Sequence, residues 1–139
     1  MAGIRLGMAF ASSSIINVFS KIKYPYNVNT LTQKKALDLL SEDTQMKGWV
    51  KELLIEREKL QRELQKMPFV RKIYPSDANF ILLKTDEPRK IYNFLVDKNI
   101  IIRDRSGVAL CEGCLRITVG TPEENNALLE ALHEVAHSS

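Results

Sequence analysis

Two histidines and a glutamate near the end of the chain have the spacing of a zinc site. The segment HEVAH, residues 133–137, matches the pattern H-E-x-x-H, in which the histidines bind zinc and the glutamate acts as a base. Aliphatic residues at helical spacing predict a buried stripe that leaves both histidines on the opposite, solvent-facing side. This stripe consists of Leu128, Ala131, Leu132 and Val135. Because the chain ends at Ser139, we expect no third ligand after the motif and no metal there.

Two cysteines, in the segment CEGC at residues 111–114, could contribute half of a zinc site or form a redox pair. Eighteen residues separate Cys114 from His133, which is longer than the spacing of a zinc finger. Cysteine pairs of cytoplasmic proteins are usually reduced and inert. We therefore expect neither a metal nor a disulfide here, and a zinc hydrolase stays open as a minor alternative.

Three arginines lie close together in the sequence, and Arg116 has the clearest setting. In LRITV, residues 115–119, aliphatic residues alternate with Arg116 and Thr118, so a half-buried strand would place Arg116 on its polar face. A guanidinium held on a strand presents a planar fork of N–H donors that matches a carboxylate or a phosphate. Ordinary surface positions are the alternative for Arg116 and for the nearby Arg103 and Arg105.

The residues after this strand predict the start of the last helix. Gly120 ends the strand, Thr121 is an N-cap, and Pro122 takes the first helical position. Glu124 completes a capping box with Thr121, in which each side chain accepts a hydrogen bond from the backbone of the other residue.

Upstream patterns predict three helices and three further strands. The helices span residues 33–40, 45–66 (capped by Thr44) and 88–98 (capped by Asp86), and the strands span 69–74, 78–84 and 100–103. One face of the second helix is expected to hold Trp49, Leu53, Leu60, Leu64 and Met67. Asn99 stands where a helix often ends in a left-handed residue. This order predicts an α/β sandwich with helices packed on one small sheet.

The N-terminal region has a different pattern. Ile4, Leu6, Met8 and Phe10 alternate with less apolar residues, which predicts a strand, and the apolar run is too short for a signal peptide. Residues 12–32 mix apolar residues with turn formers and are expected to form a connector.

The composition excludes several classes of protein. The chain has 139 residues, of which 45% are hydrophobic, so it can bury the core of one domain. Twenty basic and seventeen acidic residues give a net charge of +3, which is too small and too scattered for a nucleic-acid or membrane-surface binder. No stretch approaches the ~20 apolar residues that a membrane span requires. We expect a soluble cytoplasmic protein.

Five segments together resemble a known family. They are AGIRLG (2–7), YPYNVN (24–29), SDANFILLK (76–84), IIIRDRSG (100–107) and GCLRITVGTPEENNALLEAL (113–132). In this order they resemble the C-terminal half of the histidinol-phosphate aminotransferases, which are pyridoxal-phosphate enzymes of the aspartate-aminotransferase fold type. The same segments also resemble, in large part, those of the threonine-phosphate decarboxylases.

The resemblance implies a transamination between glutamate and imidazole-acetol phosphate in histidine biosynthesis. It implies that Arg116 holds the substrate carboxylate or phosphate, that Arg103 assists on the phosphate, and that Arg5 grips the phosphate of the cofactor. The lysine that bonds the cofactor would lie upstream of residue 1, so Lys21 and Lys23 are not given that role and no catalytic residue is expected in the chain. The fragment alone is then expected to be inactive and to lack the cofactor.

The resemblance also implies a domain organisation. Residues 1–31 would be a remnant of the large cofactor domain with a connector, and residues 32–139 the small C-terminal domain. That domain would have a small, mostly antiparallel sheet with helices on one face, preceded by an orphan strand of the large domain. The parent enzyme would be a homodimer, and the fragment could self-associate through its N-terminal strand.

Two matters stay open from the sequence. A stand-alone anion-binding regulatory domain is an alternative function, because Arg103 and Arg116 could clasp a phosphorylated metabolite without chemistry. Four residues of the connector have no assigned role beyond aromatic packing and turn formation, namely Tyr24, Tyr26, Asn27 and Asn29.

Overall fold

A computed structural model describes residues 2–41 and 43–137. Contacts divide the chain into two units, Met1–Gly48 (unit 1) and Trp49–Ser139 (unit 2), and the boundary lies within the long helix α3, Asp43–Leu64. The predicted domain boundary between residues 31 and 32 concerns the parent enzyme and stays a prediction. No helix of the described residues is both long enough and apolar enough to span a bilayer.

The strand predicted at the start of unit 1 is wrong. Ala2–Ile4 forms a short 3-10 helix, η1, and residues 6–12 have no regular structure. An alternating pattern makes a strand only where a neighbouring strand supplies backbone hydrogen bonds, and the described part of unit 1 contains no strand. Met8 and Phe10 are exposed, Phe10 to 91%. Self-association of the fragment through this segment stays a prediction.

The connector predicted at residues 12–32 contains a helix, which corrects that prediction. Helix α1, Ser13–Ile22, has Ile15, Val18, Phe19 and Ile22 at helical spacing, and all four side chains are exposed.

Helix α2, Thr30–Ser41, contains the helix predicted at 33–40. Its start is fixed by Asn29, whose Oδ1 accepts a hydrogen bond from the Thr32 amide at 2.9 Å. Ala36 is the one buried residue among those described in unit 1.

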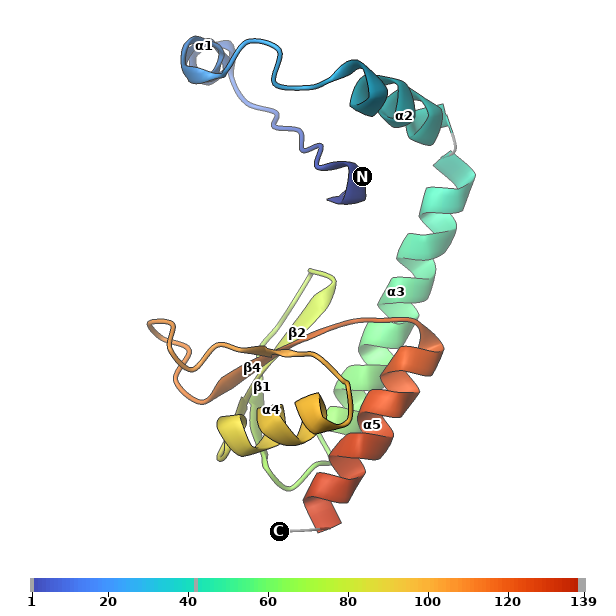
Figure 1. The fold of residues 1–139 in the computed structure, drawn as a ribbon, viewed down its shortest axis with the longest axis vertical. Helices are drawn as coiled ribbons and strands as arrows, with labels where there is room; N and C mark the ends of the chain where they lie inside the picture. Colours follow the sequence, from blue (N-terminus) through green and yellow to red (C-terminus); the bar gives the residue numbers. More distant parts are fainter. Residues whose placement is uncertain (1, 42, 138–139) are drawn as a thin grey trace. The chain divides into compact units, whose positions relative to one another are not determined.

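Unit 2 is built on a four-stranded antiparallel sheet of order β1-β2-β4-β3 (Figure 1). Its strands are β1 (Val70–Ile73), β2 (Phe80–Thr85), β3 (Arg103–Asp104) and β4 (Cys114–Thr118). In the two central strands Ile81 lies opposite Ile117 and Leu83 opposite Leu115. All four side chains are buried, so one face of the sheet carries the core.

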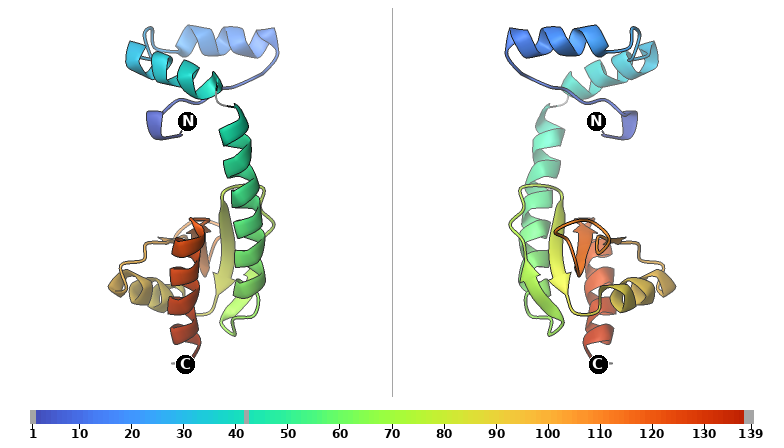
Figure 2. Two further views of the ribbon diagram at one scale, coloured as in Figure 1. Left: turned by 90° about the vertical axis from the view of Figure 1, so that its right-hand side faces the viewer. Right: turned by 90° about the vertical axis from the view of Figure 1, so that its left-hand side faces the viewer.

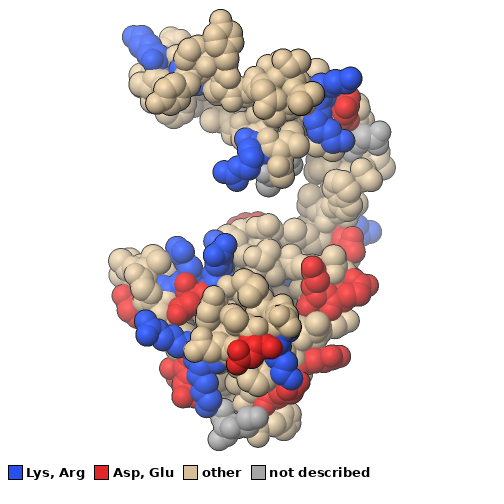
Figure 3. Space-filling view, in the orientation of Figure 1, with Lys and Arg blue, Asp and Glu red and all other residues tan. Residues whose placement is uncertain are grey.

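The helices of unit 2 cover that face. Helices α3, α4 (Pro88–Asp97) and α5 (Pro122–His137) contribute to the same core as the sheet, and Figure 2 shows the sheet with its helices from two sides. The helical core residues are Leu60, Leu64, Ile91, Leu95, Leu128, Leu129, Ala131, Leu132 and Val135. The predicted fold, a small antiparallel sheet with helices on one face, is confirmed. Charged side chains are spread over unit 2, whereas the visible surface of unit 1 is mostly uncharged (Figure 3).

Several predicted details differ from the structure. Thr44 lies inside α3 and is not its cap, and Trp49 is 56% exposed although Leu60 and Leu64 of the same predicted face are buried. Asp86 does not cap α4, because the N-cap position is Glu87, and the Asp86 carboxylate forms an ion pair with Arg71.

The strand expected at 100–103 is also shorter than predicted. The left-handed Asn99 (φ 61°) ends α4 as predicted, and the Ile100 amide still bonds to Leu95 of that helix. Regular pairing with β4 therefore begins only at Arg103.

Candidate functional site

Strand β4 places Arg116 on the open face of the sheet. Leu115 and Ile117 on either side of it are buried in the core, so the side chain of Arg116 leaves from the opposite face, as predicted. Directly after the strand, Thr121 and Glu124 form the predicted capping box. The Thr121 amide donates to Glu124 Oε2 at 2.8 Å, and the Glu124 amide donates to Thr121 Oγ1 at 3.3 Å. The end of β4 is thus fixed to the start of α5.

The sheet brings Arg103 and Arg116 together. Arg103 of β3 lies directly opposite Arg116 of β4 in the antiparallel register, so both side chains leave from the same face. Like charges that face each other across two strands destabilise a sheet. None of the ion pairs found within residues 2–41 and 43–137 involves either arginine. A bound anion would compensate both charges.

Arg116 is prepared for such a ligand. Its guanidinium carbon lies 5.2 Å from the centre of the Phe80 ring, a distance typical of a cation–π contact. Its Nε is buried and has no hydrogen-bond partner among the described residues. A buried donor without a partner is unusual in a folded protein, because its desolvation is not compensated. The charge of Arg116 is therefore not compensated by any partner of its Nε within the described residues.

Further basic residues extend this face. Lys72 of β1 lies opposite Lys84 of β2, and Lys84 lies opposite Cys114 of β4, two residues before Arg116. The Arg105 amide, just after β3, donates to the Cys114 carbonyl at 2.9 Å. Four strands therefore contribute basic side chains to the face that the helices leave uncovered. The charge of this face suits an anionic ligand.

The CEGC segment forms a turn with two free thiols. The Cys114 amide donates to the Cys111 carbonyl at 2.9 Å. Cys114 is buried, and this burial, with the neighbouring Cys111 as the next cause, raises the pKa of its thiol. A thiol with a raised pKa is a poor nucleophile and a poor metal ligand at neutral pH. Within the described residues no group of three or more His, Cys, Asp or Glu side chains could hold a metal ion.

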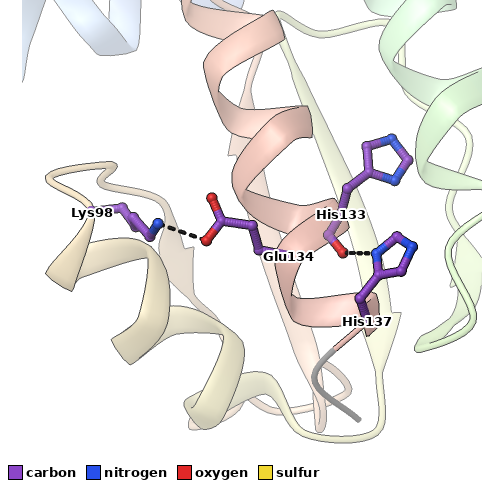
Figure 4. Close-up of polar contacts among 4 residues, drawn as sticks. All are labelled: Lys98, His133, Glu134 and His137. Atoms are coloured by element: carbon purple, nitrogen blue, oxygen red, sulfur yellow. Dashed lines mark hydrogen bonds and ion pairs between the residues drawn. The ribbon is translucent and has the colours of Figure 1, made fainter.

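The HEVAH segment does not have the geometry of a zinc hydrolase. Glu134 Oε2 accepts a hydrogen bond from Lys98 Nζ at 2.6 Å, so the carboxylate points toward α4 (Figure 4). His133 and His137 are exposed, and their rings lie away from Glu134 in the same view. His137 Nδ1 lies 2.6 Å from the His133 carbonyl oxygen, a contact within the last helical turn. This arrangement separates the base from the two ring ligands that it would have to serve.

Arg5, to which the family resemblance gives a role in binding the cofactor phosphate, belongs to unit 1. It is exposed and has a left-handed backbone with φ 58°, which is uncommon for a residue other than glycine. Sequence reasoning missed Phe80, the ring beneath Arg116. The signal was available, because in NFILLK Phe80 alternates with Ile81 and so falls on the face of Arg116.

Comparison with known proteins shows the family of the chain. A family model described as aminotransferase class I and II matches residues 1–132. A histidinol-phosphate aminotransferase from Parabacteroides distasonis is 57% identical over 131 residues, which cover 94% of this chain and 38% of the relative. One from Bacteroides thetaiotaomicron is 53% identical with the same coverage. The solved histidinol-phosphate aminotransferase from Sinorhizobium meliloti, in complex with pyridoxal-5'-phosphate, matches with a TM-score of 0.77 at 25% identity, covering 90% of this chain and 35% of that chain.

The chain spans about 38% of the length of the curated relatives that it matches. Within that part the likeness is continuous, because the family model matches residues in both units and includes Arg5, Arg103 and Arg116. The chain belongs to the aminotransferase class I and II family.

Proposed function

We propose that this chain supplies the substrate-anion site of a histidinol-phosphate aminotransferase, which transfers an amino group between glutamate and imidazole-acetol phosphate. The observation that carries the proposal is the pair of facing arginines, of which Arg116 has a buried Nε without a partner. The relatives that are 53–57% identical to the chain are named for this activity. The activity of a threonine-phosphate decarboxylase, the alternative, has no better support.

One pair of guanidinium groups can serve both substrates. Glutamate presents a carboxylate and the second substrate a phosphate, and both are planar or tripod anions that accept hydrogen bonds from an arginine fork. In this proposal Arg116 makes the shared contact, and Arg103 adds a second cation when the ligand is the doubly charged phosphate. Binding the anion would offset the repulsion between the two arginines, so the free energy of that relief adds to the affinity.

Pyridoxal phosphate is the cofactor that the family membership implies. When bound, it supplies the electron sink for amino transfer, and the protein supplies binding and orientation. Arg5 fits the phosphate of this cofactor, because it is an exposed, permanently charged residue on a short backbone turn. We assign no lysine of the chain to the bond with the cofactor. We also expect the parent enzyme to act as a cytoplasmic homodimer.

The test is the substitution Arg116→Lys in the full-length enzyme that contains this chain. Lysine keeps the charge and loses the bidentate fork, so one charge-assisted hydrogen bond is removed, worth ~1.5–3 kcal/mol. We expect kcat/KM to fall about ten- to a hundredfold or somewhat more for glutamate and for the phosphorylated substrate. Arg62→Lys is the matched control, because Arg62 is exposed and forms a surface ion pair with Glu58. An unchanged kcat/KM for both substrates would remove Arg116 from the site.

A further inference from the structure

We propose that Arg57 of α3 is a positioning residue for the anion site, acting through the loop that carries Phe80. Together with its neighbour Glu56 it holds the two chain segments that flank the Phe80–Arg116 pair. This inference rests on the proposed role of Arg116 in anion binding.

The first contact holds the segment before β2. Arg57 Nη1 donates to the Ala78 carbonyl oxygen at 2.8 Å. Ser76 stiffens the same turn, since its hydroxyl donates to the Phe80 carbonyl at 2.7 Å and accepts from the Ala78 amide at 3.2 Å. Phe80 follows two residues after Ala78, and its ring lies against the guanidinium of Arg116. Arg57 therefore fixes the backbone from which this supporting ring projects.

The second contact holds the segment after β4. Asn125 is 2% exposed, and its Nδ2 donates to Glu56 Oε2 at 2.9 Å and to the Gly120 carbonyl at 3.1 Å. The Gly120 amide returns a hydrogen bond to Asn125 Oδ1 at 3.0 Å. Glu56 is 7% exposed, so this carboxylate lies in the interior and depends on its hydrogen bond to Asn125. Gly120 follows β4 directly after Val119, four residues from Arg116.

The two held segments are joined to each other. The Val119 amide donates to the Asn79 carbonyl at 2.9 Å, which links the end of β4 to the start of β2. Arg57 and Glu56, which are adjacent in α3, thus hold the segments on either side of this hydrogen bond, Arg57 directly at Ala78 and Glu56 through Asn125 at Gly120. A shift of the loop at 78–79 would move the ring under Arg116 and change the direction of its N–H groups. Misplacement of a binding group by about 1 Å can reduce a rate on the order of a hundredfold.

The experiment uses the full-length enzyme with the substitution Arg57→Met, which keeps an unbranched apolar stem and removes the hydrogen-bond donors of the guanidinium. We expect the KM for glutamate, and the inhibition constant of inorganic phosphate as a competitor, each to rise about tenfold at a temperature well below Tm. Arg57→Lys, which keeps one donor, should recover part of the loss. Arg62→Met is the control on the same helix and should change neither constant.

A double substitution separates positioning from mere stability. If Arg57 acts through Arg116, Arg57→Met should raise KM much less in the Arg116→Lys enzyme than in the wild-type enzyme. The losses in Tm from the two substitutions should be additive. Additive effects on KM, or an Arg57→Met enzyme with a lower Tm and an unchanged KM, would overturn the inference. If Arg57→Met does not fold, the same comparison is made with Arg57→Lys. A wild-type KM in Arg116→Lys itself would instead refute the proposed function.

Discussion

Unit 1 and unit 2 contain helices of similar regularity, yet only unit 2 has a core. In the described part of unit 1 Ala36 is the one buried residue, and the apolar faces of α1 and α2 are exposed. Unit 2 buries aliphatic residues from three helices and from strands β2 and β4 in one cluster, and β1 packs partly buried residues against it. Figure 3 shows the same difference, since charged groups are sparse on the visible surface of unit 1. A local sequence pattern can thus indicate a helix, whereas a core requires long-range partners.

The most direct way to break this comparison is to remove equivalent leucines. Leu64 is fully buried in α3 and Leu37 is 70% exposed in α2. We expect Leu64→Ala to lower the free energy of unfolding by about 2–5 kcal/mol, because it leaves a cavity. Leu37→Ala should change it by less than about 0.5 kcal/mol. Urea titration followed by circular dichroism measures both, and equal losses would show that the two units share one core.

Limited proteolysis tests the comparison at the backbone. Lys21 and Lys23 lie at the end of α1, and Lys72 and Lys84 lie on strands of unit 2, and all four are exposed. Trypsin needs local opening of the chain, which should cost little free energy in unit 1 and much more in the strands that pack on the core of unit 2. We expect cleavage after Lys21 and Lys23 to be on the order of a hundredfold faster, as measured by mass spectrometry of a time course. Similar rates at the four lysines would contradict this expectation.

Helix caps offer a finer comparison. Thr121 forms a reciprocal capping box, whereas Ser12, at the N-cap of α1, bonds to the side chain of Ser14 and not to the helix backbone. Thr121→Ala should therefore destabilise unit 2 by about 0.5–2 kcal/mol. Ser12→Ala should have no measurable effect on the same urea transition. A loss for Ser12→Ala as large as that for Thr121→Ala would mean that the caps contribute in a way their contacts do not explain.

The smallest expected effect is a dependence on pH that arises in unit 2. The hydroxyl of Ser106, and next its backbone amide at 2.8 Å, lower the pKa of Asp104 below its ordinary value of 3.8. The folded state thus favours the carboxylate, and this contribution is present above pH 3.8 and is lost as the pH falls through the folded pKa. Between pH 5 and 2 the free energy of unfolding should fall less steeply in Asp104→Asn than in the wild type. Identical slopes would exclude a contribution from Asp104.

The elements of unit 2 could largely be predicted from the sequence, because the strands and helices that its patterns indicate pair and pack with one another within unit 2. The alternation around Arg116 and the capping signals at Thr121 gave the strand, the helix start and the exposed face correctly. The alternation at residues 4–10 is just as regular and gave the wrong result. A strand depends on a neighbour, and the pattern of one segment does not say whether that neighbour is present.

Helix α1 shows a different kind of error. Its apolar residues have the spacing of a helix, so the signal was in the sequence and was outweighed by the turn-forming residues around it. For the site, the family resemblance pointed to Arg103 and Arg116, but their direct opposition depends on strand register. The register follows from how β3 and β4 pair, and the short β3 could not be located from its own two residues.

The opposition of Arg103 and Arg116 has a consequence for how the chain can vary. Replacing Arg103 with a neutral residue would remove its repulsion with Arg116 in the protein without a bound anion and should raise the stability of the sheet. Selection for folding alone would therefore discard this residue. If Arg103 is retained in related chains, selection for the function of this sheet face outweighs selection for the stability of the sheet.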